Sequence, residues 1–236
     1  LKRYAHLGTG NYHPRTTRFY TDFGLLTAND EIGADVAEVF KQLTGLGQAG
    51  KLKHLWQAPF TLQPNVVAAI REEAEIARAG RKGRIVVKVN ALLEPETIEA
   101  LYEASQAGVE IDVIARSVCA LKPGVPGLSE NIRVRSIVGR FLEHHRIFYF
   151  QADGADKLYL SSADWMERNF FKRIEVAFPI LDKKLKRRAI NEGLLVYLSD
   201  NRQAWEMEST GGYHPRRVSR SKPYSAQEEL IALLGP

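Results

Sequence analysis

Apolar and polar residues alternate along the chain with two periods, and these periods predict strands and helices in turn. Period-two alternation and short apolar runs predict strands over residues 2–7, 19–27, 54–59, 84–89, 109–115, 132–138, 145–151, 157–160 and 173–180. Apolar residues at helical spacing predict helices that open near Asp30, Pro64, Pro95, Asp182 and Ser225. Strands and helices alternate between residues 54 and 115, which is typical of parallel strands with right-handed crossovers. The predicted fold class is therefore α/β, with a mixed β-sheet flanked by helices.

A glycine-rich stretch, residues 45–50, separates a short first part of the chain from a longer second part. Glycine-rich segments between regular elements are typical of linkers. We therefore expect one unit over residues 1–50 and a second over residues 51–236. The sequence starts at Leu1 inside a predicted strand, which suggests that the first unit is the remnant of a longer domain.

The composition is that of a globular protein that can build a core, with 44% hydrophobic and 26% charged residues. No apolar run approaches the roughly 20 residues of a membrane-spanning helix. The single cysteine, Cys119, cannot form an internal disulfide, so a reducing compartment such as the cytoplasm is expected. A net charge of +5 favours an anionic partner such as nucleic acid, a phosphorylated metabolite or polyphosphate.

One short pattern occurs twice in the chain. In the first copy a predicted strand ends in the turn 8–11 (GTGN), and Asp22 follows the turn by eleven residues. In the second copy a strand ends in the turn 161–164 (SSAD), and Glu175 follows by the same interval. Small residues let the backbone approach a ligand closely, and a carboxylate on a neighbouring strand can orient a histidine ring. The repeat predicts two half-sites built alike.

The second copy also contains a histidine and a basic residue, His144 and Arg146, ahead of Asp164. The first copy has no room for an equivalent of this histidine, so we expect one upstream of Leu1. Arg116 follows the apolar run 109–115. Because reactive side chains converge at the strand ends of an α/β domain, these residues predict half of a phosphate-handling site.

Each candidate has both a functional and a structural interpretation. His144 can protonate or hold a phosphate near neutral pH, or it can simply pack. Arg116 can take two phosphate oxygens with its planar guanidinium, or it can form a surface ion pair worth ~0–1 kcal/mol. Tyr20 can contact adenine or phosphate, or it can belong to the core. The supporting candidates are Asn11, Asp22, Arg146, Asp164, Arg173 and Glu175.

Five stretches carry a family resemblance: YAHLGTGNY (4–12), YTD (20–22), LEH (142–144), YLSSADWM (159–166) and RIEV (173–176). Together they resemble the C-terminal part of bacterial polyphosphate kinases, within the phospholipase D-like superfamily. The resemblance implies a phospholipase D-like fold. Residues 1–50 would be the remnant of a first catalytic domain of this type, and residues 51–236 a second, complete one.

The resemblance also implies an activity. The family transfers the terminal phosphate of ATP reversibly to inorganic polyphosphate through a phosphohistidine, with magnesium, as a homo-oligomer (dimer or tetramer) on the cytoplasmic side of the cell, in association with the membrane. Tyr20, Arg116 and His144 match positions that the family uses at ATP and its phosphates, with His144 as the second catalytic histidine. The nucleophilic histidine and the residues linked to magnesium would lie outside this chain, so the isolated chain is expected to be inactive.

The sequence departs from the broader superfamily pattern at three positions: Arg146 replaces lysine, Gln151 replaces an aspartate, and Asp164 replaces asparagine. The second half-site is therefore expected to assist a reaction rather than to attack phosphorus. Two alternatives stay open from the sequence. One is a phosphodiesterase of the phospholipase D type, and the other is a module that binds polyanions or nucleic acid without catalysis; the kinase interpretation requires no nucleic acid.

Overall fold

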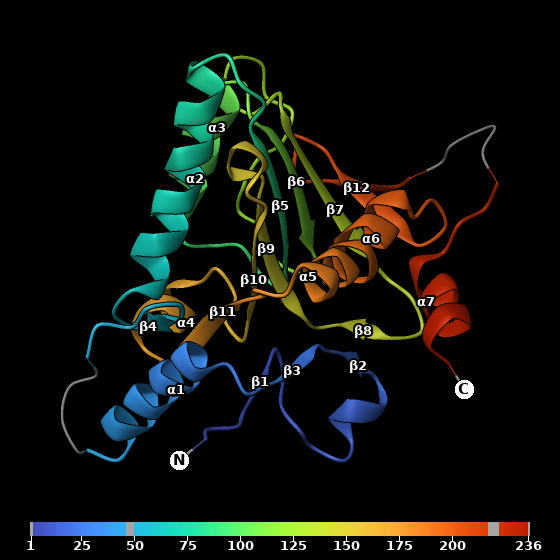
Figure 1. The fold of residues 1–236 in the computed structure, drawn as a ribbon. Helices are drawn as coiled ribbons and strands as arrows, with labels where there is room; N and C mark the ends of the chain where they lie inside the picture. Colours follow the sequence, from blue (N-terminus) through green and yellow to red (C-terminus); the bar gives the residue numbers. More distant parts are fainter. Residues whose placement is uncertain (1, 46–49, 217–221, 236) are drawn as a thin grey trace.

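The computed structural model describes residues 2–45, 50–216 and 222–235. A nine-stranded sheet forms its centre, in the order β13-β12-β7-β6-β5-β9-β10-β11-β4 (Figure 1). The strands are β4 (Trp56–Ala58), β5 (Arg84–Val89), β6 (Glu110–Ala115), β7 (Ile132–Ile137), β9 (Arg146–Phe150), β10 (Lys157–Ser161), β11 (Glu175–Pro179), β12 (Ala204–Met207) and β13 (Tyr213–Pro215). The predicted fold class, a mixed sheet flanked by helices, is confirmed.

The middle of the sheet is parallel and its flanks are antiparallel. Strands β5, β6 and β7 pair in parallel, with Val87 opposite Val113 and Val113 opposite Val134. All the other strand pairs of this sheet are antiparallel. The two parallel pairs each have a long connection between their strands, and the antiparallel pairs include both hairpins such as β9-β10 and strands distant in sequence such as β5 and β9.

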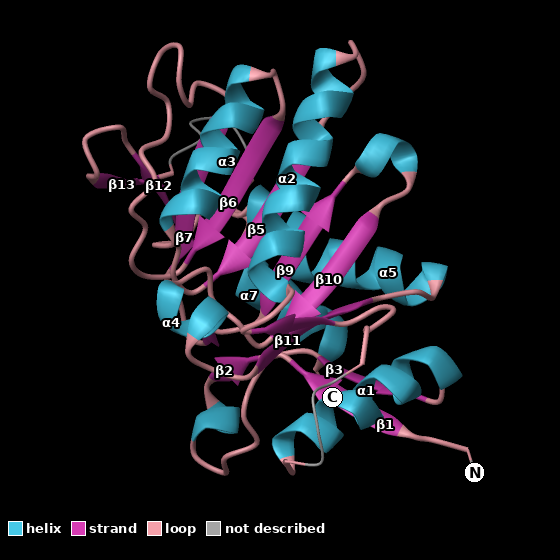
Figure 2. Ribbon diagram, turned by 90° about the vertical axis from the view of Figure 1, so that its left-hand side faces the viewer, coloured by secondary structure: helices cyan, strands magenta, loops and turns pink. Residues whose placement is uncertain are grey.

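Helices cover both faces of the sheet, as Figure 2 shows. On one face lie α2 (Leu62–Arg78) and α3 (Pro95–Gln106), which pack on one side of β5. On the other lie α5 (Lys183–Ile190), the π-helical turn η3 (Asn191–Leu195) and α6 (Val196–Ser199). Because side chains alternate along a strand, Val87 and Val89 face α2 and α3, while Val86 packs in the second core. The same alternation sends the buried Lys88 to the second face.

Residues 2–45 lie beside the nine-stranded sheet and do not add a strand to it. Strands β1 (Ala5–Gly8) and β3 (Gly24–Thr27) form an antiparallel pair, and β2 (Tyr20–Thr21) pairs in parallel with β8 (Leu142–Glu143). Helix α1 (Asp30–Leu43) follows, and the side chain of Asn29 caps it by accepting from two backbone N–H groups. The single strand predicted over 19–27 is wrong, because β2 and β3 pair with different partners.

The remaining elements are short or C-terminal. They are η1 (Thr16–Arg18), η2 (Ala152–Gly154), α4 (Glu167–Phe171) and α7 (Ala226–Leu234). The strand predicted from residue 173 begins at Glu175, and the sequence patterns missed β8, β12, β13 and α4. The predicted linker falls largely on residues 46–49, outside the described residues, and the division of the chain at residue 50 stays a prediction. Within the described part of the chain, no helix is both long and apolar enough to cross a membrane.

Candidate functional site

His144 stands between β8 and β9, with its ring against residues of the first part of the chain. Its Nδ1 lies 2.9 and 3.0 Å from the two carboxylate oxygens of Asp22. The ring of Tyr20 lies beside it, with 4.7 Å between ring centroids. The backbone N–H of His144 donates to the hydroxyl of Thr21 at 3.2 Å. Three successive residues of one segment thus hold this histidine.

The carboxylate of Asp22 is well supplied with donors. Burial alone raises its pKa, but hydrogen bonds with His144 and from Thr9 outweigh that effect, so the pKa lies below its ordinary value. The hydroxyl of Thr9 donates to Asp22 at 2.7 Å. A side chain at Gly10 would collide with the Asp22 carboxylate, because an added Cβ would stand 2.1 Å from it. The small residues of the 8–11 turn therefore make room for Asp22.

Arg146 is a buried cation held by a buried carboxylate. It donates through Nε and Nη2 to the two oxygens of Asp164, at 3.2 and 2.9 Å. Its Nη1 donates to the carbonyl of Thr9 at 3.0 Å and lies 3.1 Å from Nε2 of His144. Asp164 also accepts from the backbone N–H groups of Asn90 and Ala91. This bidentate pair fixes the guanidinium against the histidine ring.

Arg116 reaches the same edge of the sheet through Asn90, which follows β5. Its Nε donates to the side-chain oxygen of Asn90 at 3.0 Å, and the amide nitrogen of Asn90 lies 3.4 Å from the carbonyl of His144. Burial lowers the pKa of Arg116; the charge of Asp164 raises it and that of Arg146 lowers it. Arg116 and His144 therefore share one neighbour at the ends of β5 and β6.

The repeat seen in the sequence has a matching geometry. The backbone N–H of Thr9 donates to the carbonyl of Phe23 at 3.0 Å, and the N–H of Phe23 donates back to the Thr9 hydroxyl at 3.0 Å. Ser162 and Val176 make the same two hydrogen bonds, at 3.1 and 3.2 Å. In both copies the hydroxyl also donates to the acid that precedes Phe23 or Val176 in the chain, Asp22 or Glu175. The two turns therefore have the same hydrogen-bond geometry.

The other supporting candidates lie apart from the histidine cluster. Glu175 accepts from Ser162 and, at 2.9 Å, from Asn169. Arg173 is half exposed and approaches Glu175 only to 4.0 Å. Asn11 is exposed, and the described residues provide it with no side-chain hydrogen bond. The structure thus brings together Tyr20, Asp22, Arg116, His144, Arg146 and Asp164, and leaves Asn11, Arg173 and Glu175 outside that cluster.

Beneath the cluster is a buried network of charged and polar groups. Lys88 donates to Glu143 at 2.7 Å and lies 3.3 Å from Nδ1 of His145. Burial lowers the pKa of Lys88 to about 8, although Glu143 raises it. Burial raises the pKa of Glu143, but the charge of Lys88 and the hydrogen bonds from Lys88 and Gln227 hold it at about 2. Burial and the charge of Lys88 lower the pKa of His145 to about 3, so His145 is neutral and accepts through Nδ1.

Thr21 and Gln227 join this network to the site. The hydroxyl of Thr21 donates to Glu143 at 3.0 Å and accepts from the N–H of His144. The side chain of Gln227, on α7, donates to the other oxygen of Glu143 at 2.6 Å. Sequence reasoning missed these residues; the one available signal was Lys88, a lysine inside an apolar strand. His145, next to His144 in the chain, is 2% exposed.

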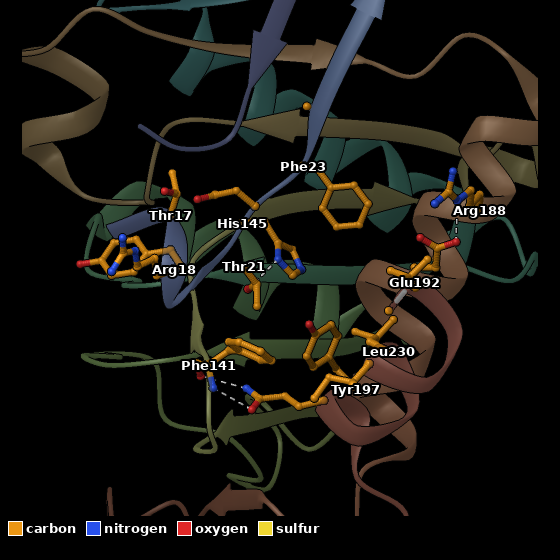
Figure 3. Close-up of a pocket in the computed structure, with 17 residues that line it drawn as sticks. Thr17, Arg18, Thr21, Phe23, Phe141, His145, Arg188, Glu192, Tyr197 and Leu230 are labelled. Atoms are coloured by element: carbon orange, nitrogen blue, oxygen red, sulfur yellow. Dashed lines mark hydrogen bonds and ion pairs between the residues drawn. The ribbon is translucent and has the colours of Figure 1, made fainter. Parts of the chain in front are cut away.

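A cavity of about 600 Å³ borders the network, with Thr21, His145 and Gln227 in its lining. Figure 3 shows Phe23, His145 and Tyr197 around this space, with Thr21 beside His145 and Leu230 of α7 beside Tyr197. Tyr20 and Asp22 line it as well. The wall between this cavity and His144 is therefore formed by residues 20–22.

Two turns with the same hydrogen bonds, one on the β1-β3 pair and one on the nine-stranded sheet, belong to an α/β protein in which a histidine, two arginines and two carboxylates meet at the edge of the large sheet. Comparison with known families agrees. The model for polyphosphate kinase C-terminal domain 1 matches residues 1–49, and that for polyphosphate kinase C-terminal domain 2 matches residues 55–227. The chain belongs to the polyphosphate kinase family, which confirms the resemblance noted in the sequence.

Individual relatives give the same result. The chain is 66% identical over 232 residues to a polyphosphate kinase of Burkholderia multivorans and 67% identical over 231 residues to one of Paraburkholderia phytofirmans. Each match covers 98% of this chain and 34% of the relative, so the chain spans about a third of their length. The crystal structure of polyphosphate kinase from Porphyromonas gingivalis superposes with a TM-score of 0.93 at 38% identity, covering 98% of this chain and 35% of that one. A phospholipase D family member, Nuc from Salmonella typhimurium, gives a TM-score of 0.47 at 15% identity over 65% of this chain and 96% of that chain.

Proposed function

We propose that the longer protein to which this chain corresponds transfers the terminal phosphate of ATP to inorganic polyphosphate, reversibly, through a phosphohistidine. ATP, ADP and polyphosphate are then its ligands, and its nucleophilic histidine lies upstream of this chain. The family membership supports the substrates. The observation that carries the assignment to a site is the convergence of His144, Arg146 and Arg116 at one edge of the sheet.

In this proposal His144 acts on a phosphate oxygen through Nε2. Asp22 accepts from Nδ1, which fixes the proton there and leaves Nε2 as the nitrogen that can give or take a proton. The side chain of His144 is 14% exposed, and Nη1 of Arg146 lies 3.1 Å from Nε2. His144 thereby protonates the leaving phosphate oxygen in one direction and takes the proton back in the other.

The two arginines have different parts in the proposal. Arg146 is committed to Asp164 and supplies a fixed positive charge beside the ring. The side chain of Arg116 donates to Asn90 through Nε alone. Both of its terminal nitrogens are free of hydrogen-bond partners within the described chain. Its planar guanidinium can therefore take two phosphate oxygens. Phosphoryl transfer depends mainly on positioning and on such charge stabilisation.

Magnesium belongs to the proposal as the cofactor of the whole enzyme, where it would neutralise phosphate charge. The carboxylates nearest His144 do not fit as its ligands, because Asp22 is engaged by His144 and Thr9, and Asp164 by Arg146. Among the described residues no cluster of three acidic, histidine or cysteine side chains could hold a metal ion. We propose magnesium ligands outside this chain, a homo-oligomeric enzyme, and a cytoplasmic location.

The test uses the full-length enzyme with His144→Ala. We expect synthesis of polyphosphate from ATP to fall at least 100-fold with the fold unchanged, because proton transfer typically contributes 10²–10⁴ in rate. His214→Ala is the matched control, since His214 is half exposed and far along the chain on β13. Normal synthesis by the His144→Ala enzyme would remove His144 from the mechanism. A non-catalytic polyanion-binding module would instead show salt-sensitive binding and no transfer in either protein.

A second test uses the 236-residue chain alone. Incubated with ATP labelled in its terminal phosphate, it is expected to gain no acid-labile, base-stable label, because the nucleophile is assigned to the upstream part. Label on this chain would place the nucleophile within it.

A further inference from the structure

Helix α5 presents a cluster of cations that the site described above does not use. Five of its eight residues are lysine or arginine. Of these, Arg188 pairs with Glu192 at 2.6 Å. The other four, Lys183, Lys184, Lys186 and Arg187, form no ion pair with any described residue. Like charges three and four residues apart on a helix repel one another, so the cluster carries an energetic cost as it stands.

Three of these cations converge on a hollow of about 400 Å³. Lys183, Lys186 and Arg187 line it together with residues 154–156, the loop between β9 and β10. Lys186 is partly buried there, although no carboxylate partners it.

The carboxylates around the hollow are all engaged elsewhere. Asp156 accepts from the hydroxyl of Tyr149 at 2.6 Å. Asp153 pairs with Arg81. Asp182 caps α5 by accepting from two backbone N–H groups at 2.8 Å. The hollow therefore presents a net positive surface with unoccupied donors, which suits an anion with several oxygens.

We propose that this hollow, lined by Lys183, Lys186 and Arg187, holds a distal stretch of the polyphosphate chain while its end reacts near His144. The inference rests on the proposed function, because that function supplies the polyanion. The hollow lies at the far end of β9 and β10 from His144, and a five-residue strand spans roughly 15–20 Å. A chain of a few phosphates is too short to occupy both places. Helix α5 would therefore contribute to the binding of long polyphosphate chains and not of short ones.

The experiment compares long and short polyphosphate as substrates of the full-length enzyme in ATP formation from ADP. In the Lys183→Gln/Lys186→Gln enzyme we expect the KM for chains of several hundred phosphates to rise about 10-fold. The KM for chains of about five phosphates, and for ADP, should change less than twofold. The dependence of the long-chain KM on salt should become shallower, because fewer counterions are exchanged. The matched control is Lys82→Gln/Lys122→Gln, which removes two exposed lysines that form no ion pair with the described residues.

Three results would overturn the proposal. The first is an unchanged KM for long chains, and the second is an equal rise for short and long chains, which would place the lysines at the reacting phosphates or in folding. The third is loss of binding to RNA or to vesicles of anionic lipid with polyphosphate kinetics intact, which would assign α5 to another polyanion. A parent enzyme that forms no ATP from polyphosphate would instead refute the proposed function itself.

Discussion

Replacing Gln227 tests whether the C-terminal helix holds the segment that carries His144. Gln227 is 2% exposed, and its side chain makes three hydrogen bonds to β8 and its approach. Its oxygen accepts from the N–H of Phe141 at 2.9 Å, and its nitrogen donates to the carbonyl of Phe141 at 2.9 Å and to Glu143 at 2.6 Å. Gln227→Leu keeps most of the volume and removes all three.

The expected cost follows from the kinds of hydrogen bond lost. A hydrogen bond to a buried carboxylate contributes about 1.5–3 kcal/mol, and a neutral one about 0.5–1.5 kcal/mol. Water can replace part of the two bonds to Phe141, because that residue is only partly buried. We therefore expect opening of residues 141–145 to become easier by about 3 kcal/mol. At about 1.4 kcal/mol per factor of ten, exchange of their amide hydrogens should accelerate roughly 100-fold.

Amide hydrogen exchange measured by mass spectrometry on the 236-residue chain would show this. The amides of Phe141, His144 and His145 all donate within the cluster, so the peptide that contains them reports on the site directly. Glu229→Leu is the matched control, since it places the same side chain on the exposed face of α7. We expect that control to leave the 141–145 peptide unchanged. Unaltered protection in Gln227→Leu, or equal acceleration across β5 and β6, would refute a local role for this glutamine.

Three further predictions concern single groups. In the full-length enzyme, Asp22→Asn should lower kcat for polyphosphate synthesis roughly 10- to 100-fold at near-constant KM for ATP, because the amide no longer fixes the proton on Nδ1 of His144; an unchanged kcat would contradict that role. The pKa of Glu143, about 2 in the folded chain against 4.5, stabilises the folded state above pH 4.5 by about 3 kcal/mol, and this is lost as the pH falls from 4.5 to 2. Urea unfolding of Glu143→Gln across that range should therefore depend less on pH than that of the parent chain. Burial raises the pKa of Cys119 to about 11, so iodoacetamide at pH 7 should alkylate it roughly 100-fold more slowly than a free thiol, and rapid alkylation would show that it is exposed.

The sequence predicted those parts of the fold that depend on residues close together in the chain, such as the ends of strands and helices. The span of β5 matches its prediction residue for residue, because an apolar run bounded by Gly83 and Asn90 leaves little choice of ends. Helix α1 begins at Asp30, where the sequence predicted that a helix opens. The 153-residue offset between the turns of Thr9 and Ser162 was visible in the sequence, and the structure repeats it hydrogen bond by hydrogen bond.

The parts that could not be predicted depend on contacts distant in sequence. Pairing of β2 with β8 involves two residues on each strand, too few to produce a periodic pattern. Asn90 links Arg116 to His144 only because β5 and β6 end together beside the start of β9, and nothing near Asn90 in the sequence indicates this. A polar residue at a strand end has many possible partners, and only the assembled sheet selects one. The roles assigned to the site residues stay predictions until the variants are measured.

Residues 2–45 lie against β8, and this contact places Asp22 beside His144. Asp22 belongs to the first half-site, yet the ring it holds, His144, belongs to the second. Glu175 repeats the setting of Asp22, with the hydroxyl of Ser162 in place of that of Thr9, and no histidine among the described residues contacts it. If the repeat extends to function, each acid orients the histidine of the opposite lobe. Neither lobe is then complete alone, and the β2-β8 contact is the place where one lobe supplies the carboxylate that the other requires.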